Sequence, residues 1–181
     1  KVQPTSDPFL KYTSGYKSSI ETNLIVLSAD IADNSELVVY PEAELPYALE
    51  SNDFISFIDK LDSSKTIITG AWHFEDKKLY NSMINIDTGQ IYNKIHLVPF
   101  GEYIPFIASL RGLISFFDMP MSNLSKGENA VIMDVGHGSF SPLVCFDIVF
   151  GEMVRKDVKS SDYIINLSND TWFGNSFGPY Q

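Results

Sequence analysis

The order of strand-like and helix-like segments is the feature that most limits how this chain can fold. A helical spacing of apolar residues over 17–33 precedes a short buried run at 37–40. Two turn signals follow in the middle of the chain, and a helix-like and a strand-like segment come near its end. Helices that fall between buried strands, with hairpins in the middle, predict an α/β domain with a mixed sheet or sheets.

Turn residues predict where the two hairpins lie. Asp87-Thr88-Gly89 separates strand-like runs at 79–86 and 90–94, and Gly136-His137-Gly138 separates runs at 130–135 and 139–145. The other expected elements are a strand at 66–72, a helix capped by Asn52, a helix at 152–159 and a strand at 163–168. The sequence contains no repeat, low-complexity tract or linker, so residues 1–181 are expected to form one domain.

Charge and hydropathy exclude several functions. The net charge of −10 argues against nucleic acid as a partner, because that affinity comes mainly from lysine and arginine on phosphates. No stretch approaches the roughly 20 apolar residues of a transmembrane helix. The chain lacks an initiator methionine and a visible signal peptide, and it stops abruptly at Gln181, so it is expected to be a fragment of a longer protein.

Cys145, the only cysteine in the sequence, ends the strand-like run at 139–145. It has no partner for an internal disulfide, so it is either a small apolar core residue or a reactive group. Glu42 and Lys94 favour the second interpretation, because each lies at the polar end of its own strand-like run. Sites commonly gather at strand ends in α/β folds.

The three residues have complementary chemistry. A cysteine thiol at its ordinary pKa is only a few per cent thiolate near neutral pH. A nearby carboxylate such as Glu42 can accept the thiol proton, and a nearby ammonium such as Lys94 can stabilise a thiolate and an oxyanion. The opposing interpretation is that Glu42 and Lys94 are solvated surface charges.

The segment 103–125 is unusually apolar, and its only charges are Arg111 and Asp118. Two prolines and a glycine interrupt it, which a plain core helix would not normally contain. It is either an irregular loop that packs on the core or an apolar lid, including Phe116 and Phe117, that meets a lipid or a partner.

Three motifs carry a resemblance to a known family. Pro41-Glu42, the run Lys94-Ile95-His96-Leu97-Val98-Pro99-Phe100-Gly101-Glu102, and Val144-Cys145-Phe146-Asp147 occur in the order Glu, Lys, Cys. They resemble the nitrilase superfamily of carbon–nitrogen hydrolases. The second motif and residues 168–181 more closely resemble the bacterial apolipoprotein N-acyltransferases, and the similarity covers essentially the whole chain.

The resemblance implies an αββα sandwich, of which the C-terminal part is missing from this chain. It implies a domain that faces the periplasm of a bacterium and is attached to the inner membrane by helices outside this chain, with the apolar loop 103–125 as a further membrane contact. The implied reaction moves an acyl chain from a phospholipid to the α-amino group of the diacylglyceryl-cysteine of a lipoprotein, through a cysteine thioester.

The resemblance also assigns roles to residues. Glu42 is implied as the general base, Lys94 as the stabiliser of thiolate and oxyanion, Cys145 as the nucleophile, and Glu102 as a second carboxylate that orients Lys94 or the attacking amine. Asp147 is implied as a supporting residue, and it stands where the family more often has glutamate, whose side chain is one methylene longer. The expected substrate-binding residues are Phe116, Phe117, Phe146, Trp172 and Phe173, of which Trp172 and Phe173 are alternatively core aromatics.

Two other functions remain open from the sequence. A soluble amidase of the same superfamily would use the same three residues with water as the second nucleophile. A non-catalytic domain would use its cysteine only for packing. The three histidines lack the spacing of metal ligands, and neither a metal nor a cofactor is expected.

Overall fold

The computed structural model describes residues 2, 6, 10–13, 15–29, 31, 34–99, 101–103, 124–157 and 160–169. Among them, four strands form the first sheet, in the spatial order β1 (Leu37–Val39), β2 (Thr66–Glu75), β3 (Lys78–Asn85) and β4 (Ile91–Asn93). β1 pairs with β2 in parallel, and the other two pairings are antiparallel. The sheet is therefore mixed, as the sequence predicts.

The β3–β4 hairpin confirms the turn predicted at residues 87–89. Gly89 has a φ of 70°, and its N–H donates to the carbonyl of Asn85 at 2.9 Å. A second hairpin joins β2 to β3 through Asp76 and Lys77, whose φ values are 49° and 65°. The sequence prediction ended β2 at residue 72 and missed this turn, because Asp-Lys lacks the glycine that usually marks a two-residue hairpin.

The second sheet contains β5 (Met133–Asp134), β6 (Ser139–Val144) and β7 (Tyr163–Leu167), in that spatial order. β5 and β6 form the predicted hairpin, with Gly136 at a φ of 77° in the turn. β6 and β7 are parallel, and the chain between them forms the 3-10 helix η2 (Cys145–Val149) and the helix α4 (Gly151–Asp157). This crossover places Cys145 directly at the end of β6.

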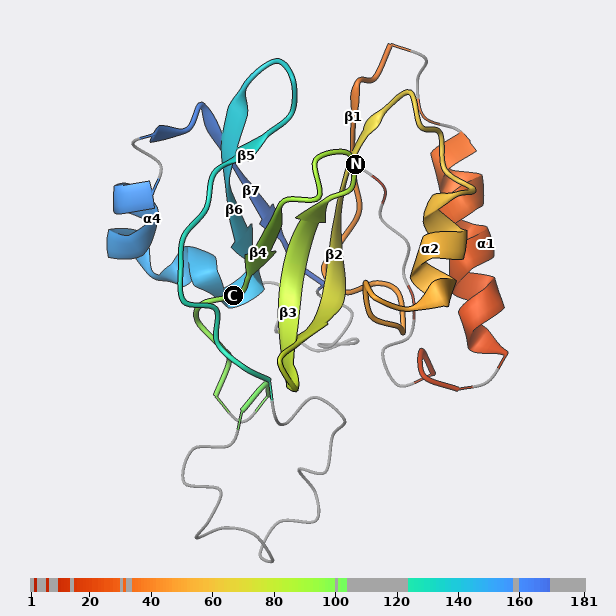
Figure 1. The fold of residues 1–181 in the computed structure, drawn as a ribbon, viewed down its shortest axis with the longest axis horizontal. Coiled ribbons are helices and arrows are strands. Elements are labelled where there is room, and N and C mark those ends of the chain that lie inside the picture. The colour runs from red at the N-terminus through yellow and green to blue at the C-terminus, as the bar shows by residue number, and fades with distance from the viewer. Residues whose placement is uncertain are drawn as a thin grey trace, which may run out of the picture.

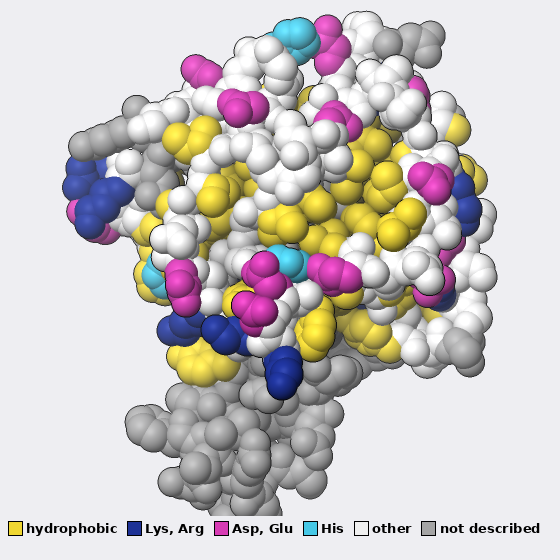
Figure 2. Space-filling view, viewed as in Figure 1, with side chains coloured by type: hydrophobic (Ala, Val, Ile, Leu, Met, Phe, Trp, Pro, Cys, Tyr) yellow, Lys and Arg dark blue, Asp and Glu magenta, His cyan; other side chains and the backbone are white. Residues whose placement is uncertain are grey.

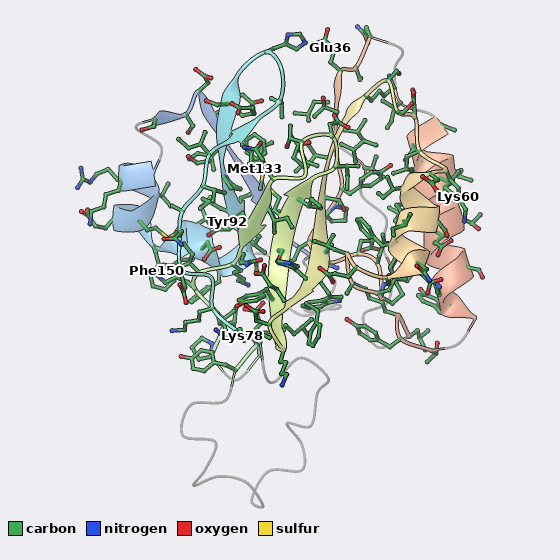
Figure 3. All side chains as sticks on the ribbon, viewed as in Figure 1. Glu36, Lys60, Lys78, Tyr92, Met133 and Phe150 are labelled. Carbon is green, nitrogen blue, oxygen red and sulfur yellow. The ribbon has the colours of Figure 1, made fainter. Side chains whose placement is uncertain are left out.

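The two sheets pack face to face between helices. Figure 1 shows α1 (Tyr16–Ala29) and α2 (Asn52–Ile58) on one side and α4 on the opposite side. Tyr92 and Met133 lie between the sheets in Figure 3, where they belong to a buried cluster. The members of that cluster are Ile68, Met83, Tyr92, Met133, Phe140, Val144 and Leu167. The predicted αββα layering is confirmed.

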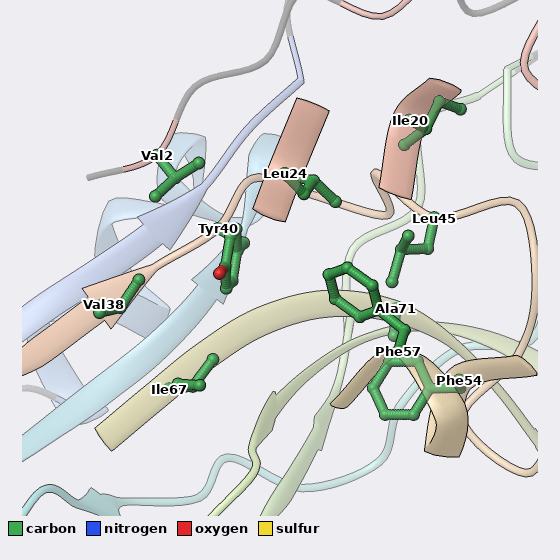
Figure 4. Close-up of a cluster of buried hydrophobic side chains, with 10 residues drawn as sticks. All are labelled: Val2, Ile20, Leu24, Val38, Tyr40, Leu45, Phe54, Phe57, Ile67 and Ala71. Carbon is green, nitrogen blue, oxygen red and sulfur yellow. The ribbon is translucent and has the colours of Figure 1, made fainter. Parts of the chain in front are cut away.

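A second apolar cluster fills the space between the first sheet and its helices. Figure 4 shows Ile20 and Leu24 of α1 and Phe54 and Phe57 of α2 gathered over this face of the sheet. α2 begins after Ser51, whose side chain accepts a hydrogen bond from the N–H of Phe54 at 3.2 Å. The sequence prediction placed the cap one residue later. The rest of the cluster is Val2, Val38, Tyr40, Leu45, Ile67 and Ala71.

Acidic side chains are spread over the face shown in Figure 2, with apolar side chains exposed between them. Lysine and arginine side chains lie mainly toward the margins of this face. No helix within the described residues is both long enough and apolar enough to cross a bilayer.

Candidate active site

A close crossing of two backbone segments positions Glu42. The residue lies shortly after β1, and the next residue, Ala43, has a φ of 39°. Gly70 of β2 donates its N–H to the carbonyl of Pro41 at 3.2 Å. A Cβ atom at Gly70 would lie 2.6 Å from the Cα of Glu42, so only glycine lets the loop pass this close to the strand.

Lys94 directly follows β4, two residues after Tyr92. Because strand side chains alternate between faces, Lys94 continues the side of the sheet on which Tyr92 packs. Its N–H donates to the carbonyl of Asn81 at 2.9 Å, and its carbonyl accepts from Gly127 at 2.8 Å. A Cβ atom at Gly127 would lie 2.0 Å from the carbonyl oxygen of Asn93, so this approach also requires glycine. The Lys94 side chain is only 1% exposed.

Cys145 begins η2 with a φ of 51°, a backbone conformation that non-glycine residues rarely adopt. Asp147, which is fully buried, stabilises this turn. Its carboxylate accepts hydrogen bonds from the N–H of Val144 at 3.2 Å, the hydroxyl of Tyr92 at 2.9 Å and the N–H of His96 at 2.7 Å. A strained residue held by its surroundings is typical of a functional site. Asp147 therefore joins the turn after β6 to the segment that carries Lys94.

Buried carboxylates surround the Lys94 ammonium. Its Nζ lies 2.8 Å from Glu102 and 3.7 Å from Oε1 of Glu42. The amide of Asn81 donates to Glu42 at 2.7 Å and to Glu102 at 3.0 Å. Glu102 also accepts from the N–H of Val98 at 2.8 Å. The cluster therefore unites residues that follow β1 and β4 with Asn81 of β3 and with the loop that carries Glu102.

The partly buried thiol of Cys145 lies in the electrostatic field of this cluster. It interacts with the charges of Glu42, Lys94 and Glu102, and it has a hydrogen bond with the side chain of Ser168. The structure thus brings together the three residues that the sequence singled out, with Glu102 beside them.

Burial and charge shift the pKa values of the cluster. Burial, and then Glu42, raises the pKa of Cys145 to about 12, while Lys94 opposes the rise. Burial also raises the pKa of Glu42, again opposed by Lys94. Burial lowers the pKa of Lys94, but Glu42, Glu102 and Cys145 together outweigh it and leave that pKa above its ordinary value. The resting site therefore holds a neutral thiol beside an ammonium.

Two asparagines of the cluster were missed by sequence reasoning. Asn81 lies within β3, and Asn169 donates its N–H to Oε2 of Glu42 at 3.1 Å. Both are nearly inaccessible to solvent, at 2% and 6% exposure. A polar side chain that interrupts a buried strand needs a hydrogen-bond partner, and that signal at Asn81 would have pointed to the site.

The expected substrate-binding residues are only partly placed. Phe146 packs edge-on against Phe150, with ring centroids 5.4 Å apart, and Phe150 stacks on His96 at 3.7 Å. Four of the expected residues lie outside the described ranges, as does most of the segment 103–125: Phe116, Phe117, Trp172 and Phe173. Within the described part of the chain, no group of three or more His, Cys, Asp or Glu residues could hold a metal ion.

Comparison with known proteins supplies the family. The model of the carbon-nitrogen hydrolase family matches residues 22–181. The chain belongs to this family. Among curated relatives, the apolipoprotein N-acyltransferase of Vibrio parahaemolyticus is 39% identical over 165 residues, covering 82% of this chain and 32% of the relative. The same-named protein of Haemophilus influenzae is 37% identical, covering 95% of this chain and 36% of the relative. This chain of the carbon-nitrogen hydrolase family thus spans about a third of the length of these relatives, and the resemblance inferred from its motifs is confirmed.

Solved structures support the fold. A nitrilase-superfamily protein of Saccharomyces cerevisiae aligns with a TM-score of 0.60 at 20% identity, covering 91% of this chain and 64% of that protein. The glutamine-dependent NAD+ synthetase of Acinetobacter baumannii aligns with a TM-score of 0.61 at 16% identity, covering 84% and 30%. At these identities the likeness concerns the fold alone.

Proposed function

We propose that residues 1–181 are the catalytic domain of an N-acyltransferase that modifies bacterial lipoproteins. The acyl donor is a phospholipid, and the acceptor is the α-amino group of an N-terminal diacylglyceryl-cysteine. The observation that carries the proposal is the meeting of Glu42, Lys94 and Cys145 in a chain 39% identical to an apolipoprotein N-acyltransferase. The domain faces the periplasm, and membrane helices outside this chain hold it at the inner membrane.

In the first half-reaction, the sulfur of Cys145 attacks the ester carbonyl of the phospholipid. The thiol is neutral at rest because its pKa is raised to about 12, so its proton must leave as the carbon–sulfur bond forms. Glu42 accepts that proton and returns it to the ester oxygen when the carbon–oxygen bond breaks. A lysophospholipid leaves, and a thioester remains on Cys145.

Lys94 stabilises negative charge in both transition states. Its ammonium, held by Glu102 at 2.8 Å, faces the region where the thiolate and then the carbonyl oxyanion develop. Because the Lys94 side chain is only 1% exposed, this charge is more effective than it would be in solution. Glu102 and Asn81 orient the ammonium and the Glu42 carboxylate before the substrate arrives.

In the second half-reaction, the lipoprotein amine attacks the thioester. A carbon–nitrogen bond forms, the carbon–sulfur bond breaks, and Glu42 takes a proton from the amine. That proton then restores the thiol of Cys145, so the enzyme returns to its starting state. Because the lysophospholipid leaves before the lipoprotein amine reacts with the covalent intermediate, the kinetics are ping-pong.

Acyl transfer from a phospholipid to a lipopeptide tests this function. The full-length protein is incubated with a defined diacyl phospholipid in detergent micelles and with a synthetic diacylglyceryl-cysteine peptide that has a free α-amino group. We expect an N-acylated peptide and a lysophospholipid in equal amounts, and no product with Cys145→Ala. Release of free fatty acid in place of the N-acylated peptide would instead indicate a hydrolase that uses water.

A further inference from the structure

A second buried pair of charges lies beside Glu42, in addition to Lys94 and Glu102. The side chains of Lys11 and Glu44 are 2% and 1% exposed, although lysine and glutamate are almost never fully buried unless they are paired. Glu44 lies two residues after Glu42 on the same loop, whereas Lys11 comes from the chain before α1. The steps of the acyl transfer use neither residue.

Lys11 and Asn169 hold the loop that carries Glu42. The ammonium of Lys11 donates to the carbonyl of Ala43, the residue whose φ of 39° turns the chain after Glu42. The side-chain amide of Asn169 donates to the carbonyl of Glu42 and to Oε2 of Glu44, both at 3.4 Å. Its backbone N–H donates to Oε2 of Glu42 at 3.1 Å. Glu42 and Glu44 therefore share one partner, and Lys11 fixes the peptide between them.

Lys11 and Glu44 also change the electrostatic environment of Glu42, the proposed base. Glu42 faces Lys94, Glu102 and Cys145 on one side, and it interacts electrostatically with Lys11. Lys11 faces Glu44, Glu42 and the ring of Tyr12, whose centroid is 6.0 Å from Nζ. Burial lowers the pKa of Lys11 to about 8, while Glu44 and Glu42 raise it. Because such coupling is reciprocal, a charged Lys11 favours the ionised form of Glu42. Glu44 faces Lys11 and the side chain of Ser6, and burial raises its pKa. Since the carboxylates of Glu42 and Glu44 both contact Asn169, a charged Glu44 disfavours the ionised form of Glu42.

We propose that Lys11 and Glu44 are positioning residues that hold the Glu42 loop and shift, in opposite directions, the pH at which Glu42 becomes able to accept the thiol proton. This inference rests on the proposed role of Glu42 as the base. Lys11 keeps Glu42 ionised at lower pH, and Glu44 limits that effect. Neither residue touches the reacting atoms.

The pH dependence of Cys145 acylation tests the pair. Its acid limb is the pH range in which the rate falls as Glu42 becomes protonated. A water-soluble p-nitrophenyl ester acylates the thiol without any phospholipid or lipopeptide, and the burst of p-nitrophenol gives the rate at each pH. Lys11→Met removes a positive charge with little change in length, so the acid limb should move up by roughly one pH unit. Glu44→Gln removes a negative charge with no change in shape, so the limb should move down. The shift should be smaller, because burial raises the pKa of Glu44 and reduces its charge at acidic pH. The acid limb of the double variant should lie between those of the two single variants.

Lys60→Met and Glu21→Gln provide the matched control. These residues form an ion pair at 3.2 Å beside α1 and α2, with the Lys60 side chain 50% exposed, and neither change should move the limb. Shifts in the same direction for Lys11→Met and Glu44→Gln, or no shift in the isosteric Glu44→Gln, would overturn the inference. Opposite shifts in a protein that fails to use phospholipid would support this pair and reject the proposed acyl donor, so the two failures are distinguishable.

Discussion

The apolar cluster beneath α1 and α2 and the charged cluster at the strand ends are both buried, but different forces hold them. The first consists of side chains such as Ile20, Leu24 and Phe57, which are at most 2% exposed and pack among other hydrophobic side chains. The second buries Glu42, Lys94 and Glu102, whose transfer from water is unfavourable unless charges and hydrogen bonds compensate it. The helix side thus stabilises the domain, and the strand ends place reactive groups at the expense of stability.

Replacing Lys94 should show the difference between the apolar cluster and the charged cluster most clearly. Lys94→Met leaves the carboxylates of Glu42 and Glu102 buried without their ammonium, which should cost about 3–5 kcal/mol of unfolding free energy at neutral pH. Acyl transfer should fall by roughly 100- to 1,000-fold, the loss typical when an oxyanion stabiliser is removed.

The pH dependence of this loss has a defined sign. Without the ammonium, which opposes the rise, the folded-state pKa of Glu42 climbs further above its unfolded value, so the folded protein binds more protons. Its stability should therefore recover as the pH falls through the raised pKa of Glu42. Chemical denaturation at several pH values measures the recovery, and a deficit that stays constant from neutral to acidic pH would contradict the account.

A core truncation on the helix side is the matched experiment. Phe57→Ala should cost about 3–5 kcal/mol, because it leaves a cavity beneath α2. Since no charge is involved, this loss should not depend on pH. The rate of transfer per folded molecule should remain close to that of the parent; a large loss of that rate would mean that the two regions are not independent.

The crossing at Gly70 should affect activity more than stability. In Gly70→Ala the new Cβ atom would lie 2.5 Å from the backbone nitrogen of Ala43, so the loop that carries Glu42 must move. A displacement near 1 Å typically lowers a catalytic rate about 100-fold. Gly151→Ala, with open space around its Cβ position, is the control and should leave the rate of transfer unchanged.

Asn81→Ala should have the smallest effect of the series. It removes the amide that donates to Glu42 and Glu102, at a cost of about 1–3 kcal/mol. Because that hydrogen bond lowers the pKa of Glu42, its loss should move the acid limb of the pH–rate profile to higher pH. An acid limb that stays at the parent's pH in Asn81→Ala would show that Glu42 does not control it.

The same contrast explains what the sequence could predict. Apolar spacing locates α1, and turn residues locate the hairpins at Gly89 and Gly136, because these signals are local. The turn at Asp76 and Lys77 has no such local signal. It forms because β2 and β3 pair along their length, from Ile68 with Asn85 to Glu75 with Lys78. Glu42, Lys94 and Cys145 were recognisable from their motifs. Asn81, Lys11 and Glu44 were not recognised, since their importance comes from contacts between distant segments.

The central claim is that buried charges make Cys145 a nucleophile that carries the acyl chain. The direct measurement is to mix the full-length protein with a phospholipid of defined acyl mass and no acceptor, quench in acid, and determine the mass of the peptide that contains Cys145. The account predicts one acyl group on that peptide, lost when a diacylglyceryl-cysteine peptide is added, and far slower acylation in Glu42→Gln. An unmodified Cys145 peptide alongside normal formation of N-acylated product would contradict it.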